Sequence, residues 1–508
     1  MPFPTPVGAV LASAALAVLA VLAALPTHAQ LAQPRTSPPG TLVVQANGVA
    51  SELTLARDLG ANGARVIPNV GWFGVEPIVG GGYDWSTPDN TQRAVDAAGL
   101  ENFRVFLSTR RDDPGKPACA ADPGAMFLLS PSLRAPWQDF VRAAVERYNG
   151  DGVSDMPGLV KSVKRWSYTP EVGTFFCPQG DVTGFATMFA LTADAVHAAD
   201  PSAEVLLPLN TQGPYLCAFV DGYLSRETIA FKGQTLTKSQ ASTAYAQNIA
   251  FTKAILGAIR PDAYDLHLYG DADEIPQRKR WLLDYVKSQG LPEKPVYAME
   301  GGEPFPDFGE HFATGPATCT GGAEDAPRLA FQSGALVRHV VLALSSGYGV
   351  VTWNLFSEYG NFGTAFGDLD LLDACGRTRP AYQTFSLARE KLVPFASSEE
   401  MAGLPAGVRL FRFKFASPKA DVYVAWDALA ASGTVTPRNL SAFVPFANAA
   451  VTHAVTAAGA SGPLVTSEPS SAVAVGATPV FLEGMGGTLH RPVVMGPTGI
   501  PASHPARR

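Results

Sequence analysis

Charged residues are scarce in this sequence, and no stretch of it is basic. Asp, Glu, Lys and Arg make up 16% of the 508 residues, and 38 cationic against 45 anionic side chains leave a net charge of −7. Proteins that bind nucleic acid usually carry clustered Lys and Arg, so we expect no nucleic-acid partner. Gly and Pro follow no period, which excludes a collagen-like chain, and with 46% apolar residues the chain can bury a large core.

The signature motifs of several enzyme classes are absent as well. The sequence has no Gly-x-Ser-x-Gly elbow, which argues against a serine hydrolase, and no phosphate-binding loop or His-Glu-x-x-His motif. Its five cysteines show no Cys-x-x-Cys spacing and no neighbouring pair of histidines. We therefore expect neither a metal ion nor another cofactor.

The pairing of the cysteines stays open at this point. Cys119, Cys217 and Cys319 fall in three long segments without a helix or strand pattern. Disulfide bonds that brace the loops around a site are one interpretation, and they would suit an exported protein. Buried free thiols are the alternative.

The N-terminal segment carries no charge. Residues 1–29 lack Asp, Glu, Lys and Arg, Val7 to Leu25 is almost wholly Ala, Val and Leu, and Thr27-His28-Ala29 offers the small residues that a signal peptidase reads. We predict an export signal over residues 1–29, a mature chain that starts near Gln30, and a secreted or periplasmic protein. A retained membrane anchor is the alternative, because the apolar run is nearly long enough to span a bilayer. No other apolar run reaches about 18 residues, so we expect no membrane contact beyond this segment.

Between residues 40 and 395, short apolar runs alternate with amphipathic stretches. In these stretches apolar residues recur at spacings of three and four, as at Phe140, Ala143, Ala144 and Tyr148. Eight strand-and-helix units of this kind predict an α/β protein with a (β/α)8 TIM barrel over residues 30–398. A doubly wound sheet is the alternative, but the Gly-rich loop that often follows its first strand is missing. The predicted strands are Thr41–Gln45, Ala64–Pro68, Phe103–Ser108, Val163–Tyr168, Glu204–Leu209, Tyr264–Tyr269, Pro295–Met299 and Gly349–Phe356.

Near residue 400 the spacing of the apolar residues changes from helical to a period of two. Phe411, Phe413 and Phe415 alternate with polar residues, and a second run ending at Trp426 repeats the alternation. Short runs of this kind, separated by Gly, Pro and Ser, predict a C-terminal β-sandwich domain over residues 399–487 with Trp426 in its core. Residues 488–508 are rich in Pro and Gly and predict a disordered tail.

Two of the predicted barrel strands end on a glutamate. Strand four runs out at Glu171 and strand seven at Glu300, and the carboxyl ends of barrel strands are where such enzymes place their chemistry. Cleavage of a glycosidic bond needs two opposed carboxylates, one that protonates the leaving oxygen and one that attacks the sugar carbon. A solvated loop carboxylate is the alternative for either glutamate alone. Two of them at facing strand ends favour catalysis.

Six segments, in this order along the chain, resemble the clan A glycoside hydrolases and the family 39-type enzymes in particular. The resemblance covers most of residues 50–485. The segments are Leu59-Gly60-Ala61 with Arg65, Trp72 with Glu76-Pro77 and Gly82-Tyr83-Asp84-Trp85, Arg147-Tyr148-Asn149-Gly150 with Trp166 and Glu171, Asp265-Leu266-His267-Leu268-Tyr269, Pro295-Val296-Tyr297-Ala298-Met299-Glu300, and Val351-Thr352-Trp353-Asn354.

The resemblance implies a retaining O-glycoside hydrolase in which Glu171 is the acid/base and Glu300 the nucleophile. The substrate would be an oligosaccharide, a polysaccharide or a simpler glycoside. The resemblance also implies that Arg65 keeps Glu300 charged, for which an ordinary salt bridge is the alternative. On strand six, Tyr269 would donate to Glu300 while His267 acts on Glu171 or on the sugar, and a buried core histidine is the alternative for His267.

Two tryptophans are further candidates for sugar binding. Trp353 would form an aromatic floor under the sugar ring, with a role in the barrel core as the alternative. Trp72 and Glu76, in the loop after strand two, could contribute to a sugar subsite, although a structural role is favoured for them. Glu303 is the rival nucleophile, but it lies two glycines beyond the end of strand seven.

One position departs from the pattern of the clan. Asn usually precedes the acid/base glutamate and binds the sugar 2-hydroxyl, whereas Pro170 has neither a side-chain donor nor an N–H. Losing such a transition-state hydrogen bond costs a factor of about 10²–10³ in rate. A catalytically weak or inactive carbohydrate-binding barrel is therefore the alternative function.

Overall fold

The computed structural model describes residues 40–66, 70–109, 112–121, 125–304, 324–353, 366–430, 434–440, 443, 453–454 and 472–483. The expected export signal and the expected C-terminal tail both lie outside these residues. Within these ranges no helix has both the length and the apolar character needed to cross a membrane.

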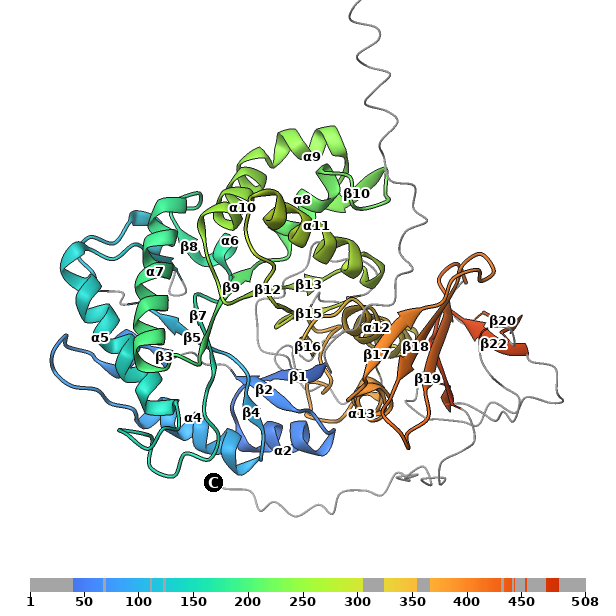
Figure 1. Cartoon of the computed structure of the whole chain (residues 1–508), viewed down its shortest axis with the longest axis horizontal. Helices are drawn as coiled ribbons and strands as arrows, with labels where there is room; N and C mark the ends of the chain where they lie inside the picture. The colour runs from blue at the N-terminus through green and yellow to red at the C-terminus, as the bar shows by residue number, and fades with distance from the viewer. Residues whose placement is uncertain are drawn as a thin grey trace, which may run out of the picture.

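Parallel strands form the centre of the larger part of the molecule (Figure 1). A sheet of six strands has the order β14-β12-β9-β7-β5-β3, and a sheet of four has the order β16-β1-β2-β4. Each of the eight predicted strand positions holds a strand, and β9 has the predicted bounds. The strands are β1 (Thr41–Ala46), β2 (Gly63–Val66), β3 (Val70–Gly71), β4 (Glu101–Asn102), β5 (Val105–Ser108), β7 (Arg165–Tyr168), β9 (Glu204–Leu209), β12 (Ala263–Leu266), β14 (Val296–Tyr297) and β16 (Val350–Trp353).

Backbone hydrogen bonds also connect the two sheets. The N–H of Ala298, just after β14, donates to the carbonyl of Val350 at 2.8 Å, and the N–H of Thr352 donates to the carbonyl of Ala298 at 2.7 Å. At the other side, the chain passes directly from β4 of the four-stranded sheet to β5 of the six-stranded sheet, and the N–H of Phe103 in this connection donates to the carbonyl of Ala64 on β2 at 3.0 Å. All of these strands run parallel, so their carboxyl ends lie on one side of the molecule.

Amphipathic helices surround the strands, as the spacing of apolar residues predicts (Figure 1). In α5 the apolar residues Trp137, Phe140, Ala144 and Tyr148 are all buried, and the indole N–H of Trp137 donates to the hydroxyl of Thr192 on α7 at 3.1 Å. The larger helices are α2 (Ala50–Asp58), α4 (Ser86–Ala97), α5 (Pro131–Tyr148), α7 (Val182–Ala199), α8 (Gln212–Val220), α10 (Ala246–Ala258), α11 (Ile275–Ser288), α12 (Ala326–Ser345) and α13 (Pro380–Leu392).

Short elements fill one of the segments that showed no pattern. After α8, a hairpin of β10 (Thr228–Phe231) and β11 (Gln234–Thr237) turns at Lys232 and Gly233, which both have positive φ angles of 47° and 73°. Two such residues form the two-residue turn that suits the twist of a hairpin. The short helix α9 (Lys238–Ala244) follows at once, capped by Thr237 and Gln240.

An antiparallel sheet lies beside α12 and α13 (Figure 1). Its strand order is β17-β18-β19-β23-β21, and a separate pair joins β20 and β22. The first strand opens at Ser397, two residues before the expected domain boundary. The strands are β17 (Ser397–Glu400), β18 (Val408–Lys414), β19 (Val422–Asp427), β20 (Val435–Asn439), β21 (His453–Ala454), β22 (Ala472–Gly476) and β23 (Val480–Glu483).

Both faces of this antiparallel sheet are covered. Leu410 and Tyr423 pack with Val473 and Val475 of β22 in a small core of their own. On the other face, Phe413 packs against Phe395 at the end of the α/β part, with ring centroids 5.2 Å apart, and joins the main core.

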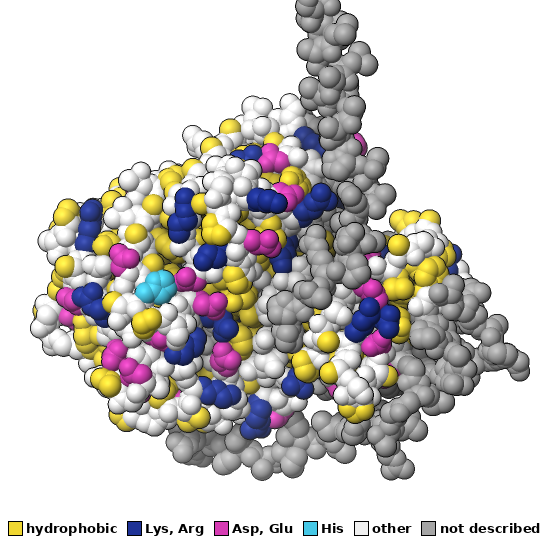
Figure 2. Space-filling model, in the orientation of Figure 1, with side chains coloured by type: hydrophobic (Ala, Val, Ile, Leu, Met, Phe, Trp, Pro, Cys, Tyr) yellow, Lys and Arg dark blue, Asp and Glu magenta, His cyan; other side chains and the backbone are white. Residues whose placement is uncertain are grey.

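Trp426 is fully buried in the same main core, where it stacks on Phe411 with ring centroids 5.1 Å apart. This agrees with the structural role expected for it. On the visible face of the whole molecule, cationic and anionic side chains are interspersed (Figure 2).

Candidate active site

Glu171 lies just beyond the carboxyl end of β7, where Thr169-Pro170-Glu171 leads into the short helix α6 (Val172–Phe175). Thr169 is buried and has φ of 78°, which β-branched residues seldom adopt. Such strain persists only where the surrounding structure fixes the chain.

The segment after Glu171 is fixed to a neighbouring loop in two ways. The short strand β8 (Phe176–Cys177) pairs with β6 (Met126–Phe127), and Cys177 forms a disulfide bond with Cys119. These links hold the chain that carries Glu171.

The other two described cysteines differ. Cys375 is also in a disulfide bond, whereas Cys217 is a buried free thiol on α8. The interpretation that Cys217 takes part in a brace around the site is therefore wrong. Its side chain faces the helical layer, with Sγ 3.8 Å from the carbonyl oxygen of Ile249 on α10.

Glu300 follows β14 and is held through its backbone. Its carbonyl accepts a hydrogen bond of 2.8 Å from the N–H of Leu268, and the next two residues form β15 (Gly301–Gly302), which pairs with β13 (Leu268–Tyr269). A Cβ atom at position 301 would lie 2.8 Å from Cε1 of His339 on α12. Only glycine fits here without moving that ring, so the sequence after Glu300 is constrained by packing.

Four side chains lie close to the carboxylate of Glu300, namely Arg65, Arg104, Tyr269 and His267. Arg65 on β2 pairs with Oε1, and the hydroxyl of Tyr269 donates to Oε2 at 3.1 Å. A second guanidinium, Arg104, lies 3.9 Å from Oε1. Burial by itself would raise the pKa of Glu300, but Arg65, His267 and Arg104 together hold that pKa below its usual value. Glu300 is thus kept ionised, as a nucleophile requires.

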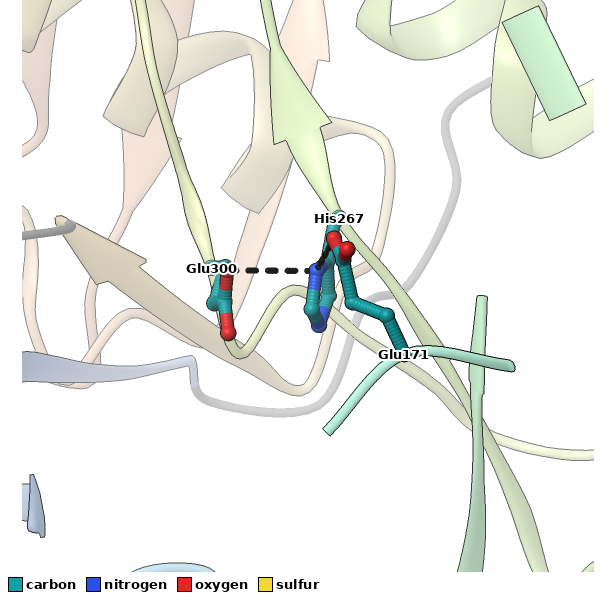
Figure 3. A group of neighbouring side chains, drawn as sticks. All are labelled: Glu171, His267 and Glu300. Atoms are coloured by element: carbon teal, nitrogen blue, oxygen red, sulfur yellow. Dashed lines mark hydrogen bonds and ion pairs between the residues drawn. The ribbon is translucent and has the colours of Figure 1, made fainter. Parts of the chain in front are cut away.

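His267 lies between the two glutamates (Figure 3). Its Nδ1 is 2.7 Å from Oε1 of Glu171 and 3.3 Å from Oε2 of Glu300. On the far side of the ring, Nε2 is 3.6 Å from Oδ2 of Asp265, an ion-pair distance beyond that of a hydrogen bond. Burial lowers the pKa of His267, but Glu300, Asp265 and Glu171 more than offset this and raise it to about 9. The ring is therefore an imidazolium at neutral pH.

The two glutamates approach each other closely. One oxygen of Glu171, one oxygen of Glu300 and one ring nitrogen of His267 all lie within 4.8 Å of one another. Carboxyl groups about 5 Å apart are typical of retaining glycosidases, whereas inverting enzymes need a wider gap for a water molecule.

The same three atoms could in principle hold a metal ion, but the surrounding charges do not suit one. Arg65 pairs with Glu300 and Arg104 lies near the same carboxylate, so a cation would meet two fixed positive charges. The arrangement suits proton transfer.

Two tryptophans predicted to bind sugar do not have an exposed face. Trp353 is only 1% exposed, and its indole N–H donates to the carbonyl of Leu369 at 2.6 Å. A side chain that stacks on a sugar needs a free ring face. The prediction that Trp353 lies under the sugar ring is therefore wrong for this structure, and Trp353 is a residue of the core.

Trp72 is likewise fully buried, in an aromatic cluster with Trp137 and Phe140, and donates to Glu76 at 2.5 Å. This is the structural role that the sequence favoured over a sugar subsite. Glu303 is held by Arg338 on α12 at 3.2 Å, and burial raises its pKa to about 7. A carboxyl group half-protonated near pH 7 suits a nucleophile less well than Glu300 does.

Two residues of the site were not predicted. Arg104, between β4 and β5, and Asp265, on β12, are both fully buried and form an ion pair. The N–H of Met299 also donates to Oδ1 of Asp265 at 3.1 Å. The only signal in the sequence was a charged residue inside an otherwise apolar strand. Such a residue costs several kcal/mol to bury unless it is paired.

Comparison with known proteins bears on the fold. No family model matches the chain, and no curated protein matches it in sequence. The structure is similar to that of a family 39 glycoside hydrolase from the gut symbiont Bacteroides cellulosilyticus WH2, with a TM-score of 0.57 and 15% identity over 88% of this chain and 81% of that one. It is also similar to the catalytic domain of a family 30 xylanase C from Talaromyces cellulolyticus, with a TM-score of 0.51 and 10% identity over 89% of this chain and 98% of that one.

These similarities confirm, at the level of the fold, the resemblance to clan A glycoside hydrolases that the sequence motifs indicated. At such low sequence identity, the similarities support only the α/β architecture of parallel strands and surrounding helices. The chemistry has to be argued from the side chains of this chain.

Proposed function

We propose that this protein is an exported retaining O-glycoside hydrolase that uses Glu171 as acid/base and Glu300 as nucleophile. The observation that carries the proposal is the geometry of these two carboxyl groups. They stand at the ends of β7 and β14 with oxygens within 4.8 Å of each other, and only Glu300 is paired with an arginine. One group is therefore held ionised while the other contacts a proton donor, His267.

In the first step, Glu300 attacks the anomeric carbon and Glu171 protonates the leaving oxygen. The glycosidic carbon–oxygen bond breaks, and a covalent glycosyl ester forms at Glu300. Arg65 and Tyr269 hold the carboxylate of Glu300 in place for this attack.

In the second step, Glu171 accepts a proton from a water molecule. The water oxygen attacks the anomeric carbon, the ester bond to Glu300 breaks, and the sugar leaves with its original configuration. The substrate would be an oligosaccharide, a polysaccharide or a simpler glycoside, as for the hydrolases with this fold.

The architecture that positions the two glutamates is, in our proposal, a closed (β/α)8 barrel over residues 30–398. The hydrogen bonds of Ala298 with Val350 and Thr352, which connect the two parallel sheets, support closure. We further propose that residues 399–487 form a β-sandwich. Support comes from the apolar contacts between the five-stranded sheet and β22.

Export rests on two observations. Residues 1–29 have the composition of a signal peptide. The disulfide bond between Cys119 and Cys177, together with the bonded state of Cys375, suits a secreted or periplasmic protein, because such bonds persist in oxidising compartments.

A catalytically weak or inactive carbohydrate-binding protein is the second candidate. Pro170 favours it, because this residue provides no hydrogen bond to the substrate where an amide is usual for the fold. Replacing it by the amide, in Pro170→Asn, tests this point. A gain of about tenfold or more in turnover on sugars that carry a 2-hydroxyl would support a weak enzyme.

The decisive experiment is chromophore release from a panel of aryl α- and β-glycosides by the chain from Gln30. Glu300→Gln should abolish release, by a factor of about 10³ or more, while the matched variant Glu303→Gln should retain it. Glu171→Ala should recover turnover of dinitrophenyl glycosides with added azide and give a glycosyl azide of retained configuration. Activity that survives Glu300→Gln, or a silent panel, would contradict the proposal.

A further inference from the structure

Six side chains that can carry a charge, His267 among them, meet around the imidazole of His267. Three are carboxylates, and three are cationic when His267 is protonated. Glu171 and Glu300 face Nδ1 of the ring, and Asp265 faces Nε2. Tyr269, on β13, contacts Glu300 as well. The full set of charged groups is Glu171 after β7, Asp265 and His267 from β12 onward, Glu300 after β14, Arg65 on β2 and Arg104 before β5.

We propose that His267 stores the catalytic proton and passes it through Glu171 to the leaving group, and that Asp265 and Arg104 are the residues that position it for this task. The proposal rests on the proposed glycosidase function and adds the origin of the proton that Glu171 donates.

The geometry provides a direct route for that proton. Nδ1 of His267 and Oε1 of Glu171 are 2.7 Å apart, within the range of a charge-assisted hydrogen bond, so a proton can move along that line without any rearrangement. Behind the ring, Asp265 faces the other nitrogen and is itself anchored by the guanidinium of Arg104 and by the N–H of Met299. An anchored carboxylate on that side fixes the orientation of the imidazole and stabilises its charged form.

The charges of the cluster balance when His267 carries the proton. In the resting state, Arg65, Arg104 and the imidazolium oppose Glu171, Asp265 and Glu300, and the net charge is zero. If the imidazole were neutral and Glu171 ionised, one negative charge of this largely buried cluster would be uncompensated. A buried unpaired charge is costly in a low-dielectric interior.

The balance persists through the reaction. In the first step, the proton moves from Nδ1 of His267 to Glu171 and on to the leaving oxygen, while Glu300 loses its negative charge by forming a bond to the anomeric carbon. The neutral imidazole and the neutral ester then leave two arginines opposite Glu171 and Asp265, and the net charge is again zero. In the second step, a water proton returns through Glu171 to His267 as the bond to Glu300 breaks. No co-reactant other than water is needed.

The first test follows the protonation of His267 directly, by NMR of protein with ¹⁵N-labelled histidine. The signals of His267 are assigned by their loss in His267→Gln. At about pH 8, where a free histidine is neutral, the wild-type ring should show two protonated nitrogens. In Glu300→Gln, which mimics the charge of the glycosyl ester, the same ring should become neutral. Glu303→Gln, which removes a carboxylate outside the cluster, should leave it charged.

The second test uses the leaving group. Asp265→Asn keeps the size of the side chain and an acceptor for the N–H of Met299, but removes the charge. The basic limb of the pH profile of kcat/KM should move to lower pH by about one to three pH units. The loss of activity should be large on phenyl glycosides, which need a proton, and about tenfold smaller on dinitrophenyl glycosides, which do not. A merely structural defect would lower both alike.

The outcomes separate this inference from the proposed function. A ring that stays charged in Glu300→Gln, or is neutral in the wild type at about pH 8, overturns the proton store even if the panel shows glycosidase activity. If Asp265→Asn folds and the basic limb of its kcat/KM profile stays at the wild-type pH, the positioning role of Asp265 is overturned. If Asp265→Asn does not fold, the NMR comparison of wild type with Glu300→Gln decides alone. A panel without turnover, with the expected NMR result, rejects the function and with it the catalytic use of the stored proton.

Discussion

Arg65 and Glu300 form a buried ion pair that joins β2 to the end of β14. The arginine side chain is 4% exposed and the glutamate 13%. Oε1 of Glu300 takes the ion pair with Arg65, while Oε2 accepts from Tyr269. The charge and the orientation of the proposed nucleophile are therefore both set by residues from other strands.

The first prediction concerns this pair. Arg65→Met removes the nearest positive charge, so the pKa of Glu300 should rise and the acid limb of the kcat/KM profile should move to higher pH. At any pH below the wild-type limb, we expect kcat/KM to fall about tenfold for every pH unit that the limb has moved. The surface variant Arg57→Met serves as a control. An acid limb at the wild-type position would show that Arg65 does not control the ionisation of Glu300.

The second prediction concerns stability and pH. The pKa of His267 is raised in the folded protein to about 9, above the value of about 6.5 for a free histidine. The charged ring thus contributes stability that is fully present below about pH 6.5 and is lost as pH rises through about 9, in total about 3 kcal/mol. Urea unfolding at several pH values, for wild type and His267→Gln, measures this. The difference between the two should shrink across that window, and a constant difference would contradict the linkage.

The third prediction concerns the disulfide bond between Cys119 and Cys177. The bond closes a loop with a sequence separation of 58 residues, and chain entropy gives about 4 kcal/mol of stabilisation for such a loop. The double variant Cys119→Ser/Cys177→Ser should lose up to that amount and also some kcat, because the segment that carries Glu171 is released. Cys217→Ala removes the buried free thiol instead. A double variant with unchanged kcat would show that the bond does not position Glu171.

The fourth prediction tests the packing behind Glu300. Gly301→Ala places a methyl group 2.8 Å from the ring of His339 and 3.1 Å from Cβ of Leu268. Overpacking of this kind costs about 1–3 kcal/mol and should displace Glu300, lowering both the melting temperature and kcat. Adding His339→Ala should restore part of each loss. If the second substitution makes no difference, the ring is not the obstacle.

The sequence predicted the positions of the parallel strands well, because buried parallel strands read as apolar runs between amphipathic helices. It also singled out both glutamates together with His267 and Tyr269, and the structure brings these four side chains together. Position along a strand fixes the direction of a side chain, and this is why residues at strand ends could be identified.

Other features depended on three-dimensional contacts. Trp353 and Trp72 have the residue type of a sugar platform, but burial decides their role, and burial depends on neighbours such as Leu369 and Phe140. The roles of Asp265 and Arg104 follow only from the fold, because β12 and the segment before β5 bring their charges together. The pairing of Cys119 with Cys177 likewise follows from the contact of β6 with β8, two strands too short to leave a pattern.

The packing of Phe413 against Phe395 has a consequence for the evolution of the chain. One apolar core runs from the parallel strands into the antiparallel sheet. Recombination therefore could not exchange that sheet for another domain without disrupting the core of the α/β part. Cutting the chain after residue 398 would expose Phe411, Phe413 and Trp426 on the antiparallel sheet and Phe395 on the α/β part to water. The intact protein should melt in one calorimetric transition, and its two halves should be inherited together.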